Sequence, residues 1–265
     1  MNHINKFFER LWTHYIASTP QALKIRSLFT DHGEVIVNDH VAFRTFNRCS
    51  FDLDCFTQVF QRYGYNVIDD YQFPEKHLYA RAFKHDDPTM PKVFVSELLR
   101  EKLSSDHQAI IEKTIKHTSI DQFELDSLVA GRIWPLITYN EYLALAEESE
   151  YAAWLLMMGL TANHFTISVN HLQKLTTLEK VNQFLINHGF TLNSVGGLIK
   201  GGPSVHLAQS STIADRRKEL FSCGTQAKIP TCFYEFALRY KLPSGELFQG
   251  FVTNNASRIF DSTKR

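Results

Sequence analysis

The sequence of 265 residues has no net charge, because 28 lysines and arginines balance 28 aspartates and glutamates. It also shows no basic stripe with interleaved aromatic residues, so we expect no nucleic-acid partner. No apolar run approaches the roughly 20 residues that a membrane-spanning helix needs, so we expect no membrane association. The first 15 residues mix charges into their apolar positions, and we therefore expect no signal peptide.

Cysteine is scarce, and its spacing indicates neither a disulfide framework nor a cysteine-based metal motif. The four cysteines lie at positions 49, 55, 223 and 232, and no two of them form a CxxC pair. Reduced, mostly structural thiols in a reducing compartment are the simplest interpretation. The sequence therefore predicts a cytoplasmic protein.

Two parts of the chain, residues 35–97 and 159–240, repeat one order of predicted elements. Each begins with a strand that carries histidine, continues with a helix that ends in Gly-aromatic, and finishes with strands, the last of which carries glutamate. The matching segments are DHVAFRTF with NHFTISV, FTQVFQRYGYNV with VNQFLINHGFTL, and KVFVSEL with CFYEFAL. Internal repeats outweigh local detail. The pattern predicts an α+β fold in which two βαβββ units form a curved mixed sheet, the alternative being chance similarity.

The other segments complete one predicted domain, residues 1–265. Apolar residues recur at helical spacing near the start, and Pro20 should divide that region into two helices. We expect N-terminal helices in 1–34, a helical insert between the repeats in 98–158, and a C-terminal tail in 241–265.

Finer features are also predicted inside these segments. Thr138 with Glu141, and Thr176 with Glu179, have the spacing of capping boxes, which indicates that a helix begins at each. The first of these helices should run to Met158. Extended pieces are expected near 65–69, 77–83, 190–199 and 204–209.

Three residues at corresponding points of the repeats are candidates for a metal site. His40 and His164 each enter the first strand of a repeat, and Glu235 lies in an otherwise apolar last strand. A buried carboxylate is costly unless it is paired or binds a metal. Two histidines and one carboxylate leave coordination positions open, as is typical of Fe(II) oxygenases. These ligand types also bind Zn, Mn, Co and Ni, but the open positions favour Fe(II), since they accommodate a chelating 2-oxo acid and O2.

Each candidate also has a purely structural interpretation. A lone histidine is usually a core residue with satisfied hydrogen bonds, and Glu235 could pair with Arg239. Glu97 is the repeat mate of Glu235, and we expect it to be a carboxylate at a helix start rather than a vestigial ligand. Arg44 should share the strand face of His40, and a buried arginine needs an anionic partner. That partner is either a protein carboxylate, in a permanent salt bridge, or a substrate.

Six segments in order resemble the short form of the 2-oxoadipate dioxygenase/decarboxylase (hydroxyglutarate synthase) family, a relative of the vicinal oxygen chelate fold. They are DHVAFRTF, NHFTISVNHL, FLINHGFTLNSVGGLIKG, AQSSTIAD, IPTCFYEFALR and GFVTNNASRIFDST. The resemblance implies an Fe(II) enzyme that converts 2-oxoadipate, or a similar 2-oxo dicarboxylic acid, and O2 to 2-hydroxyglutarate and CO2. Longer family members carry insertions around the last strand that this chain lacks, so its substrate is less firmly implied than its metal site.

The resemblance also assigns roles to individual residues. It implies that His40, His164 and Glu235 bind Fe(II), and that Arg44 is a catalytic residue that binds a substrate carboxylate. Gln209 is implied on the pocket wall, and Asn255 in a segment that contacts the substrate.

Two other functions stay open at this point. One is another metalloenzyme of this fold, such as an isomerase, a lyase or a ring-cleaving dioxygenase. The other is a non-catalytic binding protein. The sequence predicts no particular oligomeric state.

Overall fold

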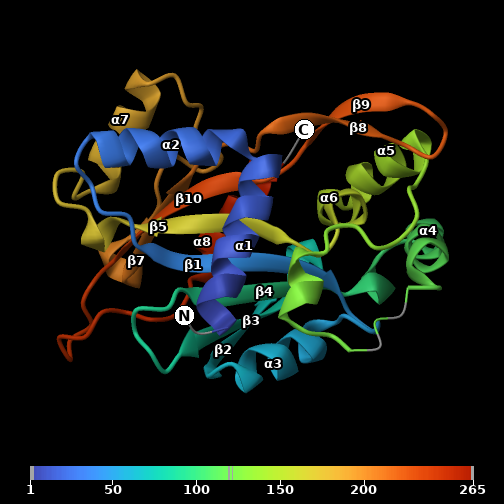
Figure 1. The fold of residues 1–265 in the computed structure, drawn as a ribbon, viewed down its shortest axis with the longest axis horizontal. Coiled ribbons are helices and arrows are strands. Elements are labelled where there is room, and N and C mark those ends of the chain that lie inside the picture. The colour runs from blue at the N-terminus through green and yellow to red at the C-terminus, as the bar shows by residue number, and fades with distance from the viewer. Residues whose placement is uncertain (1–2, 119, 121, 264–265) are drawn as a thin grey trace.

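The computed structural model describes residues 3–118, 120 and 122–263, and one eight-stranded sheet organises them (Figure 1). Its strands are β1 (Asn38–Phe46), β2 (Tyr65–Phe73), β3 (Leu78–His85), β4 (Lys92–Leu98), β5 (Ala162–Ser168), β6 (Lys200–Gly202), β7 (Leu207–Ser211) and β10 (Phe233–Arg239). They lie in the order β2-β3-β4-β1-β5-β10-β7-β6. A separate hairpin, β8 (Arg216–Leu220) with β9 (Gln226–Pro230), is inserted between β7 and β10.

Eight α-helices in the described part of the chain pack around this sheet. They are α1 (His3–Ser18), α2 (Pro20–Asp31), α3 (Leu53–Arg62), α4 (Ser105–Ile115), α5 (Tyr139–Glu148), α6 (Glu150–Met158), α7 (Leu178–Asn187) and α8 (Thr253–Phe260). In Figure 1, α1 crosses in front of the central strands, whereas α8 lies behind them and contacts β2, β6 and β7. Among these described helices, none is both long and apolar enough to cross a membrane.

The two predicted βαβββ repeats are present in the sheet. The first consists of β1, α3, β2, β3 and β4, and the second of β5, α7, β6, β7 and β10. In each repeat the first strand pairs in parallel with the last, β1 with β4 and β5 with β10. The antiparallel pair β1–β5 joins the two repeats. The strands that carry the candidate metal ligands are therefore the adjacent strands β1, β5 and β10.

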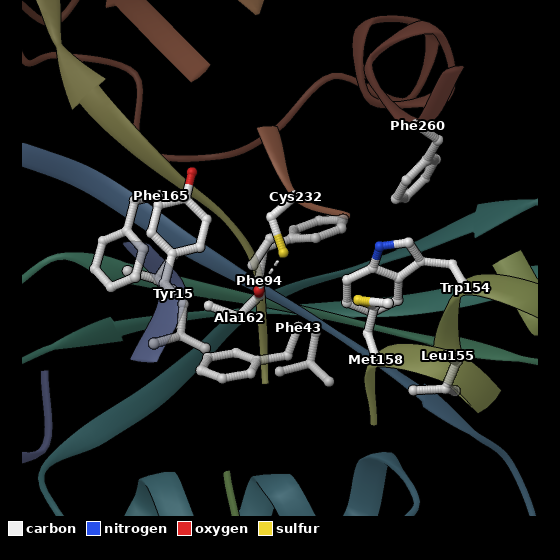
Figure 2. Close-up of a cluster of buried hydrophobic side chains, with 14 of the residues drawn as sticks. Tyr15, Phe43, Phe94, Trp154, Leu155, Met158, Ala162, Phe165, Cys232 and Phe260 are labelled. Atoms are coloured by element: carbon white, nitrogen blue, oxygen red, sulfur yellow. Dashed lines mark hydrogen bonds between the residues drawn. The ribbon is translucent and has the colours of Figure 1, made fainter. Parts of the chain in front are cut away.

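Large aromatic side chains pack between the sheet and the helices (Figure 2). The ring of Tyr15 in α1 lies 4.9 Å from that of Phe165 in β5. Beside them in Figure 2, the thiol of Cys232 donates to the carbonyl of Ala162 at 3.4 Å. The indole of Trp154 in α6 donates to a backbone carbonyl of the segment that leads into β10. These buried contacts help to fix the positions of β5 and β10.

Some local predictions are confirmed and others are wrong by a residue or more. The Thr138–Glu141 capping box is present. The second predicted box is wrong, because Thr177 rather than Thr176 caps α7 and accepts from the backbone N–H of Lys180. The helix predicted to run to Met158 is broken at a serine, since Ser149 ends α5 and caps α6 by accepting from the backbone N–H of Ala152. The first N–H groups of a helix can be capped by any nearby serine or threonine. Where several hydroxyls are close in sequence, the first residue of the helix cannot be predicted to better than about one turn.

Other predictions fail in the loops of the second repeat and in the segments outside the repeats. The segment 190–199 is not a strand; it forms turns, and one isolated bridge joins Leu192 to Thr212. The insert 98–158 is only partly helical, and the C-terminal tail 241–265 contains α8, although its last two residues lie outside the described part. The β8–β9 hairpin was not predicted, because its polar strands have no apolar alternation that would mark them as part of a sheet.

Candidate metal centre

The side chains of His40, His164 and Glu235 converge in the interior of the protein. One ligand atom of each lies within 4.8 Å of the other two. His164 Nε2 is 3.1 Å from Glu235 Oε2, and His40 Nε2 is 3.5 Å from Glu235 Oε1. All three residues are at least 96% buried, with relative exposures of 2%, 4% and 0%. The structure thus brings together the residues singled out by their positions in the repeats.

The register of the three central strands explains this convergence. Thr166 of β5 is paired with His40 on one side and with Glu235 on the other. Directly paired residues project their side chains from the same face of a sheet. His164 lies two residues before Thr166, so it shares that face. The short threonine leaves room between the longer side chains, and its hydroxyl lies 3.1 Å from His40 Nε2.

The residue before each histidine fixes the orientation of its ring. Asp39 Oδ1 lies 2.8 Å from His40 Nδ1, and Asn163 Oδ1 lies 2.9 Å from His164 Nδ1. Carboxylate and amide oxygens only accept hydrogen bonds, so each Nδ1 carries a proton, and each Nε2 points toward the centre, where the neutral ring offers a lone pair. Sequence reasoning missed both of these residues, although the dipeptides Asp-His and Asn-His occupy equivalent points of the two repeats.

A buried ion pair supports Asp39 in turn. Arg239 grips it with two hydrogen bonds, Nε to Oδ2 at 2.7 Å and Nη2 to Oδ1 at 2.8 Å. Burial acts to raise the pKa of Asp39, but the charge of Arg239 outweighs it and holds that pKa well below its usual range. The remaining nitrogen of Arg239 donates to the carbonyls of Phe248 and Gly250. The alternative pairing of Arg239 with Glu235 is therefore wrong.

Asp39→Asn should weaken metal binding while leaving the protein folded. The change removes the charge that orients His40 and one of the acceptors that hold Arg239. Losing such an outer partner of a metal-binding histidine typically costs about 10–100-fold in metal affinity. Competition with a chromogenic chelator measures the affinity.

Asp70→Asn is the matched control, because Asp70 forms an ion pair with Arg81 on the exposed surface. Equal metal affinity in wild type and Asp39→Asn would show that Asp39 does not support the site.

Protonation states at the centre suit a cation. Burial acts to raise the pKa of Glu235, but the two histidines and the Gln209 amide lower it overall, so this carboxylate is ionised. Burial lowers the pKa of His164, so this imidazole is neutral. His164 Nε2 lies 3.1 Å from Glu235 Oε2, a contact that is favourable when the two atoms share a proton or bind one metal ion. Glu235 Oε2 is also buried and accepts no hydrogen bond from any described residue.

Gln209, Glu97 and Asn255 have different relations to this centre. Gln209 on β7 is buried, and its amide nitrogen donates to Glu235 Oε1 at 2.6 Å. Glu97 accepts instead from the backbone N–H of Leu53 at the start of α3, which confirms its expected position at a helix start. Asn255 on α8 is buried and donates to the carbonyl of Leu207. Substrate contact by Gln209 and Asn255 stays a prediction.

Arg44 on β1 is 99% buried, yet no described carboxylate lies within 4.0 Å of its guanidinium. The rings of Tyr151 and Trp154 lie 4.9 Å from its Cζ atom, and that of Phe260 lies 5.8 Å away. Nη2 donates to Thr263 Oγ1 at 3.1 Å, but Nε and Nη1 have no partner in the part of the chain that is described. The permanent salt bridge considered as an alternative is therefore absent from the described residues.

Arg44 also reaches a cavity of about 420 Å³ between α5–α6, the turn Pro74–Lys76 and α8. Its walls include Tyr151, Glu150 and Phe260, but none of the three candidate ligands. The charge of Arg44 nevertheless helps to lower the pKa of His164, after the larger effect of burial. Arg44 thus lies between this cavity and the candidate metal centre.

Comparisons with known proteins agree with this geometry. The model of the 2-oxoadipate dioxygenase/decarboxylase family matches residues 7–247. A curated relative from Arabidopsis thaliana, "2-oxoadipate dioxygenase/decarboxylase, chloroplastic", is 37% identical over 250 residues, which are 85% of this chain and 67% of the relative. The crystal structure of hydroxyglutarate synthase from Oryza sativa, in complex with 2-oxoadipate, has a TM-score of 0.91 at 32% identity and covers 98% of this chain and 92% of that one.

A more distant structure bears on the fold alone. A Ralstonia eutropha protein provisionally assigned to the glyoxalase superfamily has a TM-score of 0.76 at 19% identity, over 91% of this chain and 83% of that one. The curled, mixed eight-stranded sheet built from two repeats is thus of the vicinal oxygen chelate type, as predicted.

Proposed function

This chain belongs to the 2-oxoadipate dioxygenase/decarboxylase family, and we propose that it is an Fe(II)-dependent oxidoreductase that converts 2-oxoadipate and O2 to 2-hydroxyglutarate and CO2. The reaction balances without a further reductant, because the carboxyl group next to the keto carbon leaves as CO2 with its own two oxygens, and both atoms of O2 stay in the product, one in the new carboxylate and one in the hydroxyl group. The structural neighbour from Oryza sativa binds 2-oxoadipate, which supports a small 2-oxo acid as substrate.

One observation carries the proposal, the convergence of His40, His164 and Glu235 within 4.8 Å. Two imidazoles and one carboxylate are the ligands found in mononuclear Fe(II) oxygenases, and they leave positions for a chelating substrate and O2. Bound Fe(II) supplies the chemistry of O2 activation and a point of attachment for the 2-oxo acid.

Residues around the ligands have distinct roles in this proposal. Asp39 and Asn163 hold the histidine rings with Nε2 toward the centre, and Gln209 orients the carboxylate of Glu235. Arg44 pairs with the distal carboxylate of the substrate, a task that suits a planar guanidinium with two free N–H donors. The aromatic rings around it exclude water, which strengthens that pairing.

We place the enzyme in the cytoplasm. Its four cysteines are all free thiols, as expected for a reducing compartment. The Arabidopsis relative is named chloroplastic, so location is a property to be measured for each family member.

Anaerobic reconstitution with Fe(II), followed by O2 and a panel of 2-oxo acids, tests the function. We expect 2-oxoadipate to give one CO2 and one 2-hydroxyglutarate for each O2 consumed, measured by oxygen electrode and mass spectrometry. Turnover that consumes no O2 would indicate an isomerase or a lyase on this scaffold. A protein that binds no metal and gains no thermal stability from Fe(II) would be a non-catalytic binding protein.

A further inference from the structure

Lys200 is a second buried cation on the face of the sheet that carries the candidate ligands. It lies on β6 and is 99% buried. Its direct cross-strand partner is Gln209 of β7, whose amide donates to Glu235 at 2.6 Å. Paired residues project from the same face, so Lys200 lies on this face, and one side chain separates it from the metal centre.

The ammonium group of Lys200 has few partners for a buried charge. Its one hydrogen bond among the described residues is to the carbonyl of Asn193, at 2.5 Å. No described carboxylate lies within the 4.0 Å of an ion pair. An ammonium has three donors and is seldom buried without an anion. Burial lowers the pKa of Lys200 to about 8, although Glu235 acts in the opposite direction.

Lys200 and Arg44 approach the same turn, Asp261–Thr263, which follows α8. Arg44 donates directly to the hydroxyl of Thr263. Lys200 is linked to the turn through Asn193, whose amide donates to the hydroxyl of Ser262 at 2.9 Å. The two buried cations that lack a described carboxylate partner are therefore both connected to this turn, Arg44 by a direct hydrogen bond and Lys200 through Asn193.

We propose that Lys200 is a second cationic contact for the distal carboxylate of the substrate and thereby sets the preference for dicarboxylic 2-oxo acids. This inference rests on the proposed function. Arg44 provides a directional fork from the first repeat, and Lys200 provides a point charge from the second. A structural role alone, in which Lys200 only holds the 193–200 loop, is the competing explanation.

Anaerobic titration calorimetry on the Fe(II)-loaded protein distinguishes these roles. The probes are 2-oxoadipate and 2-oxohexanoate, which have the same chain length but differ in the distal carboxylate. Lys200→Met should weaken binding of 2-oxoadipate by at least about thirtyfold, the lower end of the range for losing a buried charge partner. Binding of 2-oxohexanoate and the iron content should be nearly unchanged. Lys200→Arg should keep the preference for the dicarboxylate.

One further variant separates the effect of the Lys200 charge from the effect of its hydrogen bond to the 193–200 loop, and another is a control. Lys200→Gln can still donate to the Asn193 carbonyl without a charge, and it should lose the preference as Lys200→Met does. Lys174→Met is the matched control, because Lys174 also donates to a backbone carbonyl, that of His32, but on the exposed surface.

Equal weakening of both probes, or no weakening, in the Lys200 variants would overturn the inference and leave the proposed function standing. If the wild-type protein bound neither 2-oxo acid, the proposed function itself would fail, and the inference with it.

Discussion

Replacing any one of His40, His164 or Glu235 with alanine should abolish turnover of 2-oxoadipate and sharply reduce bound metal. Each substitution removes one of three proposed protein ligands, and no other histidine, cysteine, aspartate or glutamate among the described residues belongs to the group. Ligand atoms in such sites lie roughly 2.0–2.2 Å from the metal, so a neighbouring side chain cannot substitute without moving the backbone. Metal content after anaerobic reconstitution and gel filtration gives the result independently of activity.

A matched control for these three variants is His171→Ala. His171 follows β5, is only partly buried, and contacts the hydroxyl of Ser168 rather than the centre. Its iron content and activity should equal those of the wild type. A ligand variant that kept full iron occupancy would show that the corresponding residue is a core residue and not a ligand.

Arg44→Lys and Arg44→Ala should keep full iron occupancy but lose most of kcat/KM for 2-oxoadipate. Removing one partner of a desolvated, charge-assisted pair costs on the order of 2–5 kcal/mol. Lysine keeps the charge but not the fork that presents two N–H groups to one carboxylate. A 2-oxo acid with an apolar tail makes no such pair, so its kcat/KM should fall much less.

Stability provides the check on this interpretation of Arg44. Its guanidinium lies against the rings of Tyr151, Trp154 and Phe260, so alanine leaves space that lowers the free energy of unfolding. Thermal unfolding of each variant at saturating Fe(II) separates that loss from the loss of substrate pairing. Equal losses of kcat/KM on both substrates, or loss of iron, would make Arg44 a structural residue and remove the main argument for a dicarboxylate.

The three candidate ligands could be predicted because the chain repeats one order of elements, so residues at the same position of the two repeats can be compared. A histidine at the same point of two strands is visible in sequence, and parallel pairing of first and last strands then brings Glu235 beside His164. Asp39 and Asn163 also occupy equivalent positions of the two repeats, but their role could not be predicted until the orientations of the histidine rings were known. Arg239 and Lys200 could not be placed, because their partners depend on the 248–250 segment and on the loop that contains Asn193.

Prediction failed mainly where geometry is set by tertiary packing. The segment 190–199 contains apolar residues that suggest a strand. Instead, the side chain of Asn193 donates to the carbonyl of Arg258 in α8 and to the hydroxyl of Ser262. Strand pairing was therefore replaced by side-chain contacts that no local pattern indicates. The prediction for 241–265 was a C-terminal tail and named no helix in it. A short helix with one apolar face, such as α8, is stabilised by the surface that it covers, so local sequence does not reveal it.

The two repeats meet where β1 pairs with β5, and a metal ion bound there would hold the repeats together as well as take part in the chemistry. His40 belongs to the first half of the chain, whereas His164 and Glu235 belong to the second. An ion held by all three would be a cross-link between two halves that strand pairing, the Arg239–Asp39 ion pair and the 98–158 connection also join. Neither half contains all three candidate ligands, so metal binding requires that the two halves pack together correctly. Folding of the halves and assembly of the centre are in this sense a single event.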